Sequence, residues 1–382
     1  MKWSWKIGRF VGIDVYIHTT FILLLGWLGV SYWLQENSIL AVISGLGFIL
    51  ALFGSVILHE YGHALTARRY GVKTRDITLY PIGGVARLER IPEDPKQELW
   101  VALAGPAVNV VIALVLFVWL LVTNALEPLT TLSLTGGSFL ERLMVTNLIL
   151  VAFNLLPAFP MDGGRVLRAL LASRLEYVKA TRIASSVGQG MAYIFGFVGL
   201  LFNPFLIFIA FFVWIGAQGE ARMVSLKSAL DGIPVSSVML TNFKSLSPND
   251  SLSKVINLVL AGDQKDFPVI EDNQVVGILP QSGLLEGLRR EGETPLVKSV
   301  MQTDFQTADS HEMLDKAFAR LQSCDCHTMP ILHDDSLVGL LTMDNVGEFI
   351  RIQSLLEPEQ KEKFSRKLDQ SVVVEEHSLH TS

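Results

Sequence analysis

The apolar residues of this chain gather in its first 222 positions, in runs long enough to cross a lipid bilayer. A helix needs about 20 consecutive apolar residues to span the hydrocarbon core of a membrane. Glycine and proline inside several runs predict kinks or breaks, which are tolerated where the freed backbone is buried in protein. We predict six transmembrane helices, at residues 15–34, 39–66, 99–122, 139–157, 187–202 and 205–221.

The stretch between the second and third apolar runs has a different pattern, typical of two strands around a glycine turn. Residues 77–80 and 85–88 have the composition of short strands, and Gly83-Gly84 lies between them. The pattern predicts a hairpin or re-entrant sheet at the membrane face. An exposed strand edge there can receive an extended peptide. A loop that merely closes the cytoplasmic surface is an equally good interpretation.

After residue 222 the composition becomes that of a soluble protein, and one segment is repeated without gaps. Met239 and Pro268 of the first copy correspond to Met301 and Pro330 of the second, an offset of 62 residues in each case. Each copy predicts a short strand, a helix, two strands around a charged turn and a final helix. Because repeats of this kind bury their apolar faces against one another, we expect the two copies to pack as a pair.

The overall composition favours a multi-pass membrane protein that carries a soluble part. Half of the 382 residues are hydrophobic and only 18% are charged, and the mean hydropathy is +0.41. This profile excludes an ordinary soluble globule. The net charge of −6 gives no reason to expect nucleic acid as a partner. The two cysteines, Cys324 and Cys326, predict no disulfide framework and suit a reducing cytosolic compartment.

Basic residues are distributed unevenly about the predicted helices. Residues 35–38 and 123–138 contain no lysine or arginine, whereas the alternate segments contain many, among them Arg165 and Arg168. The positive-inside rule therefore predicts that both termini and the soluble repeats lie in the cytoplasm. The chain starts with basic residues before an apolar run, as a signal peptide does, but no small-x-small cleavage site follows. We expect an uncleaved first helix.

A metal-binding pattern ends the second apolar run, at His59-Glu60-Tyr61-Gly62-His63. Two histidines four residues apart on a helix lie on one face, within reach of a single metal ion. The glutamate between them can act as a general base on water. Ionisable groups are costly inside a membrane, so their presence in an apolar helix indicates a functional site. On the positive-inside argument, this site lies toward the cytoplasmic side.

A second motif follows the fourth apolar run, where Asn154-Leu155-Leu156-Pro157 leads to Ala158-Phe159-Pro160-Met161 and then to Asp162-Gly163-Gly164-Arg165. It places a carboxylate, Asp162, at the same predicted membrane depth as the two histidines. Two histidines and one carboxylate leave a fourth zinc position open, which is the arrangement of catalytic rather than structural zinc sites.

Together these motifs resemble the site-2 protease family of intramembrane zinc metalloproteases (M50-like), over about residues 3–222. The resemblance includes the Gly83-Gly84 loop and the Ala104–Asn109 segment. It implies that His59, His63 and Asp162 bind one Zn²⁺ and that Glu60 is the general base. It places Asn154 near the active site, where it holds the substrate backbone or the oxyanion; capping of a broken helix is the alternative. The implied substrates are single-span membrane proteins, cleaved within the bilayer in regulated intramembrane proteolysis.

The two soluble copies resemble the paired cystathionine-β-synthase (CBS) domain, often a sensor of adenine nucleotides. The family's nucleotide motif, Gly followed by two hydrophobic residues, Ser or Thr, two further residues and Asp, is incomplete here. In the second copy Thr342 and Asn345 stand at the polar positions, and they are the candidate nucleotide contacts. The first copy has neither a hydroxyl nor a carboxylate there. A structural role, or formation of a homodimer through these domains, is the alternative to nucleotide binding.

We therefore expect a polytopic α-helical membrane protein with about six transmembrane helices and a small β-hairpin or sheet element, joined to a cytosolic α/β tandem CBS domain pair. The parts are a transmembrane metalloprotease core, a linker, the two CBS copies and a charged, partly disordered tail, at residues 1–222, 223–232, 233–292, 293–353 and 354–382. Two other classes stay open. One is a membrane transporter gated by the CBS pair, and the other is a membrane scaffold without proteolytic activity.

Two smaller features have competing interpretations. Cys324-Asp325-Cys326-His327 contains soft metal ligands, but no second cluster of such ligands completes a site elsewhere in the sequence. His18, at the start of the first apolar run, is expected to be an interfacial packing residue rather than a ligand.

Overall fold

The computed structural model describes residues 3–89, 92, 94–125, 138–262, 264–291, 295–323 and 328–356. The chain divides into two compact units, residues 1–224 and 225–382, and each is described by itself. The candidate metal-binding sequence Cys324–His327 and nearly all of the predicted charged tail lie outside the described residues.

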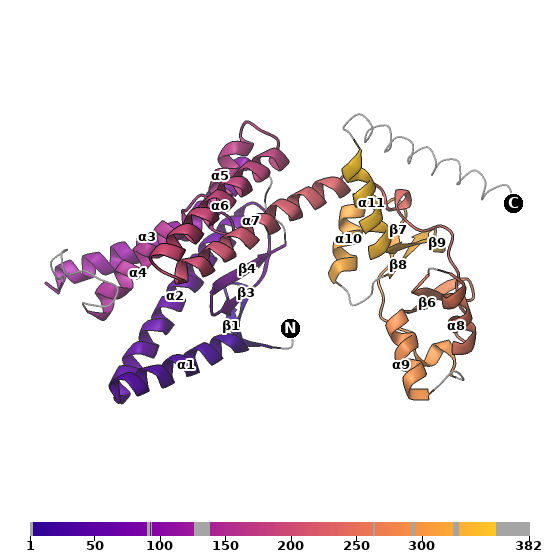
Figure 1. Ribbon diagram of the computed structural model, residues 1–382, viewed down its shortest axis with the longest axis horizontal. Coiled ribbons are helices and arrows are strands. Elements are labelled where there is room, and N and C mark those ends of the chain that lie inside the picture. The colour runs from indigo at the N-terminus through magenta and orange to yellow at the C-terminus, as the bar shows by residue number, and fades with distance from the viewer. Residues whose placement is uncertain are drawn as a thin grey trace. The chain divides into compact units, whose positions relative to one another are not determined.

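The first unit consists of helices and one small sheet (Figure 1). In chain order its elements are β1 (Ser4–Phe10), β2 (Ile13–His18), α1 (Thr19–Glu36), α2 (Ile39–Arg69), β3 (Thr74–Tyr80), β4 (Gly83–Leu88), α3 (Pro95–Val122), α4 (Phe139–Asn154), α5 (Asp162–Ala172), α6 (Tyr177–Leu201) and α7 (Phe205–Leu230), whose last residues belong to the second unit.

Four helices in the described part of the chain are long and apolar enough to cross a membrane: α2, α3, α6 and α7. This makes the chain a polytopic helical membrane protein. Helix α4 has only 16 residues, and α1 ends in the polar pair Gln35-Glu36. Helices α1 and α4 therefore fall short of the criterion of length and composition, although both coincide with predicted spans.

Several boundaries of the predicted spans differ from the helix ends; the fourth span was predicted to residue 157 but α4 ends at Asn154, and the sixth to residue 221 but α7 ends at Leu230. The first span was predicted from residue 15, but residues 13–18 form strand β2, and α1 begins at Thr19, where the His18 ring accepts a hydrogen bond from the Thr20 amide (3.3 Å). Helix α6 begins ten positions before the predicted 187, at Tyr177. Its first turns carry lysine and arginine on an exposed face, so a search for apolar runs misses them.

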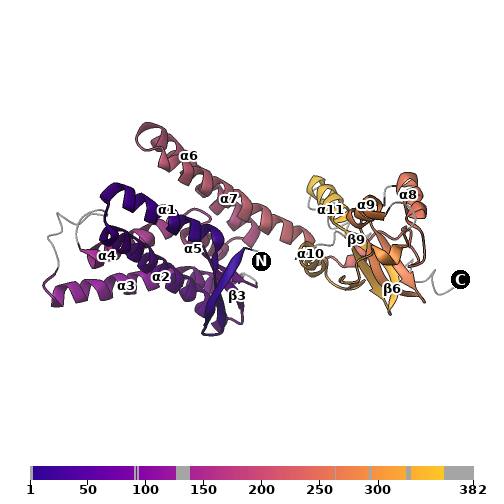
Figure 2. The same cartoon turned by 90° about the horizontal axis from the view of Figure 1, so that it is seen from below.

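The predicted hairpin at residues 77–88 is confirmed, and it belongs to a larger sheet with strand order β1-β2-β3-β4. Strands β3 and β4 are antiparallel, with Ile77 opposite Ala86. Strand β2 pairs with β3 in parallel, although the whole of α1 and α2 lies between these two strands in the sequence. The sheet packs against α2 (Figures 1 and 2) through a buried cluster that includes Ile13, Tyr61 and Ile77. Strand β4 is left at an edge, beside α2.

The second unit contains the two repeats. The first comprises the short 3₁₀ helix η1 (Val235–Ser237), α8 (Leu252–Ala261), β5 (Phe267–Glu271), β6 (Gln274–Leu279) and α9 (Gln281–Glu291); the second comprises η2 (Val297–Ser299), β7 (Ala308–Asp309), α10 (Leu314–Ser323), β8 (Thr328–His333), β9 (Ser336–Thr342) and α11 (Met343–Leu355). The registers correspond, since Pro268 faces Ile278 in one hairpin and Pro330 faces Leu340 in the other.

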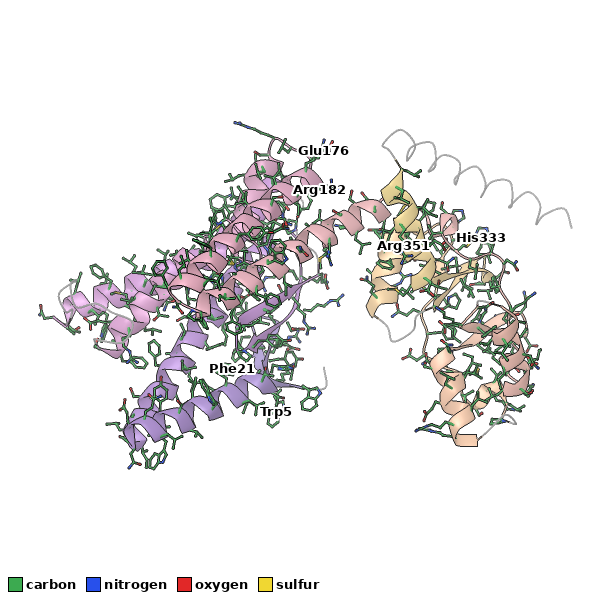
Figure 3. All side chains as sticks on the ribbon, in the orientation of Figure 1. Trp5, Phe21, Glu176, Arg182, His333 and Arg351 are labelled. Carbon is green, nitrogen blue, oxygen red and sulfur yellow. The ribbon has the colours of Figure 1, made fainter. Side chains whose placement is uncertain are left out.

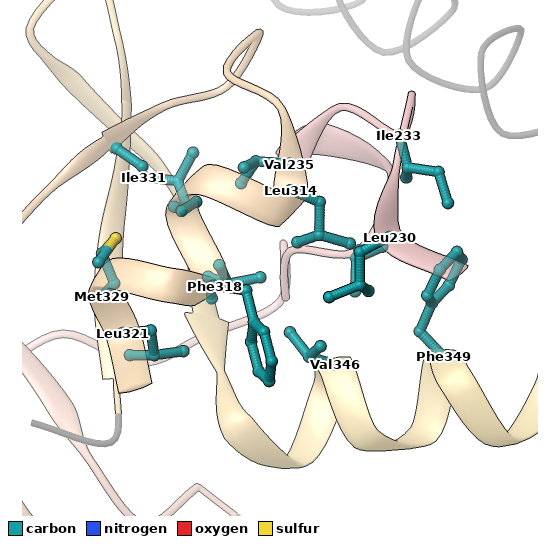
Figure 4. Close-up of a cluster of buried hydrophobic side chains, with 14 residues drawn as sticks. Leu230, Ile233, Val235, Leu314, Phe318, Leu321, Met329, Ile331, Val346 and Phe349 are labelled. Atoms are coloured by element: carbon teal, nitrogen blue, oxygen red, sulfur yellow. The ribbon is translucent and has the colours of Figure 1, made fainter. Parts of the chain in front are cut away.

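The repeats exchange their leading segments, which explains why they form one unit. Val235 of η1 is buried with Leu314, Phe318 and Met329 of the second copy (Figure 4). Conversely, Val297 of η2 is buried in the core of the first copy. The predicted packing of the copies as a pair is therefore confirmed. The predicted strand before the first helix appears only in the second copy among the described residues, as β7.

Candidate metal centre

Three predicted ligands, His59, His63 and Asp162, meet in the first unit. The Nε2 atoms of the two histidines on α2 are 3.0 Å apart, and each is 3.2 Å from the Asp162 Oδ2 atom. All three side chains are buried. Two imidazole nitrogens and one carboxylate oxygen at this spacing suit Zn²⁺ with an open fourth position. The donor set therefore fits the predicted metal.

Local structure explains why these residues meet. Helical geometry places His59 and His63 on one face of α2. Asp162 is the first residue of α5, which follows a tight irregular segment after α4. A Cβ atom on Gly163 would lie 2.2 Å from the Leu156 carbonyl oxygen. The glycine after Asp162 is thus required for the chain to fold back closely enough to bring the carboxylate to α2.

Hydrogen bonds on the far side of each imidazole orient the two rings. The His59 Nδ1 atom is 2.6 Å from Asn109 Oδ1, and the His63 Nδ1 atom is 2.7 Å from the Val101 carbonyl oxygen. Both acceptors require a proton on Nδ1, which leaves each Nε2 lone pair free for a metal. Asn109 in turn donates to Asn147 Oδ1 (2.8 Å), and both amides are buried.

The ring-orienting role of Asn109 was missed from the sequence, although this residue ends the Ala104–Asn109 segment. The signal that points to it is an amide side chain within the apolar helix α3, because a buried polar group needs a partner. The role of Asn147 follows only from its contact with Asn109.

Glycines let helix α3 approach the centre. A Cβ atom on Gly105 would lie 2.2 Å from His63 Nε2 and 2.6 Å from His59 Nε2. One on Gly62 would lie 2.6 Å from the Ala104 carbonyl oxygen. The backbone of α3 therefore forms one wall of the metal centre, and no larger residue fits at either position without movement.

The side chain of Glu60 extends from α2 to the edge of the sheet. Its Oε2 atom accepts a hydrogen bond from the Ala86 amide of β4 (3.1 Å). Gly84, also in β4, passes so close that a Cβ atom there would lie 2.8 Å from the Glu60 Cγ atom. Since β4 is an edge strand whose other side pairs with β3, the amide of Ala86 faces the unpaired edge. Helix α2 thus supplies both the glutamate that contacts this strand edge and the two histidines of the metal centre.

The register of β4 beside Glu60 is reinforced by an ion pair across the hairpin. The Arg87 guanidinium donates to both carboxylate oxygens of Asp76, at 2.9 and 2.5 Å. This hydrogen-bonded contact raises the pKa of Arg87, so the arginine keeps its charge. A bidentate pair of this kind restricts the orientation of both strands.

Arg168 of α5 was counted among the basic residues of the cytoplasmic loops, but it is fully buried. It donates through Nε and Nη2 to Glu98 of α3 (2.8 and 2.5 Å) and through Nη1 to Glu220 of α7 (2.5 Å). The guanidinium carbon is 5.0 Å from the centres of the Phe159 and Tyr177 rings. These contacts attach α5, and with it Asp162, to α3 and α7.

The remaining predicted site residues lie elsewhere. Asn154 is half-buried at the last position of α4. Thr342 and Asn345 lie in the second unit, where the Thr342 hydroxyl caps α11 by accepting from the Asn345 amide (3.1 Å) and also contacts the Asn345 side chain. Both line a cavity between β9, the start of α11 and the first repeat, together with Lys244, Asp266 and others.

Comparisons with known proteins agree with this geometry. The sequence model of peptidase family M50 matches residues 47–195, and that of the CBS domain matches residues 235–290 and 297–351. Zinc metalloprotease MJ0392 of Methanocaldococcus jannaschii is 37% identical over 281 residues, which are 73% of this chain and 78% of that protein.

A solved structure, the site-2 protease from Methanocaldococcus jannaschii, has 40% sequence identity to this chain and covers 58% of it and 96% of its own length, with a TM-score of 0.43. The identity to MJ0392 extends over most of both proteins, and the histidines and the aspartate of the motif lie together in the structure. The chain therefore belongs to peptidase family M50, as a site-2 protease zinc metalloprotease with a C-terminal pair of CBS domains.

Proposed function

We propose that this protein is an intramembrane endopeptidase that cleaves the transmembrane segments of membrane-protein substrates in regulated intramembrane proteolysis. The observation that carries the proposal is the convergence of His59, His63 and Asp162 beside Glu60, at one end of a long apolar helix. Groups of this kind are costly in a membrane, so their concentration in one place favours catalysis there.

The ligands His59, His63 and Asp162 would hold one Zn²⁺, which when bound polarises a carbonyl and makes water a stronger acid. Glu60 accepts the proton of the attacking water and delivers it to the leaving amine. Asn154 positions the substrate backbone or the oxyanion. Its place at the end of α4, a helix joined to Asp162 by a short segment, supports this role.

The edge of β4 supports a mode of substrate binding. A transmembrane helix hides its carbonyls in internal hydrogen bonds, so a substrate must unwind before hydrolysis. An extended segment can then add to a free strand edge. Strand β4 has such an edge, and its Ala86 amide already donates to Glu60. A substrate strand along β4 therefore runs beside the general base.

We further propose that α1 and α4 enter the bilayer with the four long helices, giving six segments. Large apolar side chains on both are exposed, including Trp27 and Leu34 on α1 and Leu148 on α4, and soluble surfaces rarely carry such patches. With the positive-inside rule, this arrangement has both termini and the CBS domains in the cytoplasm and the metal centre toward the cytoplasmic side.

The CBS pair is proposed to regulate the protease, with residues 1–222 as the catalytic core, 223–232 as a linker, 233–292 and 293–353 as the two copies and 354–382 as a tail. The proposed signal is an adenine nucleotide that contacts Thr342 and Asn345, supported by the cavity that both residues line. Homodimer formation through the pair is the alternative. Single-span proteins are the proposed substrates.

The test is substrate trapping in native membranes with Glu60→Gln, a variant that keeps the three ligands and removes the base. We expect one or a few single-span proteins, or their stubs, to accumulate with this variant and to disappear with the wild type. The matched control is Glu36→Gln, at the end of α1. Unchanged membrane proteomes across several growth conditions, with normal zinc content in both proteins, would contradict proteolysis and favour the transporter or the scaffold.

A further inference from the structure

A second group of metal-binding side chains lies in the second unit, remote in sequence from the catalytic motif. It consists of Asp309 at the end of β7, His311 two residues later, and His333 at the end of β8. Figure 3 labels His333. Strands β7 and β8 are parallel, with Asp309 opposite Leu332, and the Ser310 amide donates to the Leu332 carbonyl oxygen (3.0 Å). This pairing brings His333 beside the Ser310–His311 segment.

The side chains converge on one point. The Nδ1 atoms of His311 and His333 lie 3.3 and 3.2 Å from the same atom, the Ser310 Oγ. The Asp309 Oδ1 atom is 3.4 Å from His311 Nδ1. One ligand atom from each of Asp309, His311 and His333 lies within 4.8 Å of the others. Ligands of a tetrahedral Zn²⁺ are about 3.4 Å apart, from bond lengths of about 2.1 Å.

The fold itself does not require these residue types. In the first copy the corresponding positions, at the offset of 62 residues, are Ser247, Asn249 and Glu271. That copy forms the same hairpin and core without an imidazole. The second copy alone therefore carries two histidines and a carboxylate at this place, on a surface where Asp309 and His311 are exposed and His333 is half-buried.

We propose that Asp309, His311 and His333 form a second metal site, for a divalent transition-metal cation such as Zn²⁺. Imidazole and carboxylate donors together prefer Zn²⁺, Ni²⁺ or Cu²⁺ to Mg²⁺ or Ca²⁺. The exposed His311 and Asp309 side chains can rotate, so the three ligand atoms can close to bonding distance without a change in the backbone. Water or the Ser310 hydroxyl completes the coordination.

Binding at this site reinforces a junction within the second unit. The carbonyl oxygens of Ser310 and Glu312 accept hydrogen bonds from the amides of Ser236 and Val235 (3.0 and 2.9 Å). These are residues of η1, which is buried in the core of the second copy. A metal that clamps His311 to His333 therefore stabilises the segment on which η1 is held. Metal availability becomes a signal that the CBS pair can sense apart from any nucleotide.

The test measures zinc bound to the full-length chain in detergent, by mass spectrometry of the metal after equilibration in zinc-buffered solution. We expect the His311→Asn/His333→Asn variant to bind about one Zn²⁺ fewer per chain than the wild type, and to lose the rise in Tm that Zn²⁺ causes in the second unit. Mg²⁺ at the same concentration should leave Tm unchanged. Equal zinc content in the variant and the wild type would overturn the proposal.

Two controls separate this site from other ligands. Asn249→Ala/Glu271→Ala, at the corresponding positions of the first copy, should bind as much zinc as the wild type. Cys324→Ser/Cys326→Ser should also retain the additional ion; loss of that ion with the cysteines, and not with the histidines, would refute our assignment.

A second measurement keeps the proposal testable should the double histidine variant not fold. In the wild type, Zn²⁺ should protect His311 and His333 from modification by diethylpyrocarbonate, as read by peptide mass spectrometry. His18, which is half-buried and belongs to neither group of histidines, gives the unprotected reference. Equal modification of His311 and His333 with and without saturating Zn²⁺ would overturn the proposal.

Discussion

Replacement of Gly105 by alanine should remove the catalytic metal while leaving the protein folded. The new Cβ atom would lie 2.2 Å from His63 Nε2 and 2.6 Å from His59 Nε2, whereas ordinary contacts begin at 3.4 Å. The His63 ring must therefore move by about 1 Å, the difference between the two distances. Metal–ligand distances tolerate only about 0.2 Å. The substitution changes no charge and removes no ligand.

The expected cost in stability is small because two effects oppose one another. Alanine within a helix is favoured over glycine by about 1 kcal/mol. Moving both rings weakens the hydrogen bonds to Asn109 and Val101, which contribute about 1 kcal/mol each. The metal-free variant should thus lose about 1 kcal/mol in the free energy of unfolding. The clash involves the ends of side chains rather than backbone atoms, so the helices need not separate.

The assay compares zinc content and thermal unfolding, the latter with a chelator so that lost metal does not contribute. The control is Gly47→Ala in α2, where a Cβ atom meets nothing within 4 Å, and this variant should bind a full equivalent at the catalytic centre. Gly105→Ala should be folded, with that equivalent absent. Full catalytic-site zinc in Gly105→Ala would refute the placement of α3 against the two imidazoles.

Three further predictions follow from other contacts. Asn109→Ala should weaken zinc binding about 10- to 100-fold in a chelator competition, because His59 loses its orienting acceptor; unchanged affinity would show that the ring needs no such partner. Arg168→Met should cost about 3–5 kcal/mol in stability, because it leaves Glu98 buried without its counter-ion, and adding Glu98→Gln should restore much of the loss in thermal unfolding. Burial opposes ionisation of Asp250, but hydrogen bonding, chiefly from Lys254, outweighs it and lowers the pKa of Asp250. This carboxylate therefore stabilises the second unit above its unfolded pKa and ceases to do so as the pH falls through its folded pKa, so acid unfolding should be less steep in Asp250→Asn, and identical profiles would argue against the contact.

Features with a local cause could be read from the sequence. The spacing of His59 and His63 is set by helix geometry alone, so their common face needs no tertiary information. Long apolar runs similarly predict the four spanning helices, because a bilayer demands a minimum apolar length. The repeat follows from matching residues at one offset, and the two hairpins have corresponding registers because similar sequences adopt similar elements. Asp162 was assigned as the third ligand through the resemblance of this chain to the site-2 protease family, because no local rule predicts that it lies beside α2.

Features that depend on contacts between distant segments were decided only by the tertiary structure. Residues 13–18 became a strand instead of the start of α1 because β3 offers a parallel partner far along the chain. Arg168 is buried because Glu98 of α3 and Glu220 of α7 pair with it. A count of basic residues along the sequence cannot predict these partners. In the same way, Asn109 acquires its role from His59, and His333 meets His311 only because β7 pairs with β8. Local sequence sets which elements are favoured, whereas the pairing of strands and the free energy of burying polar groups depend on the partners that other elements bring to them.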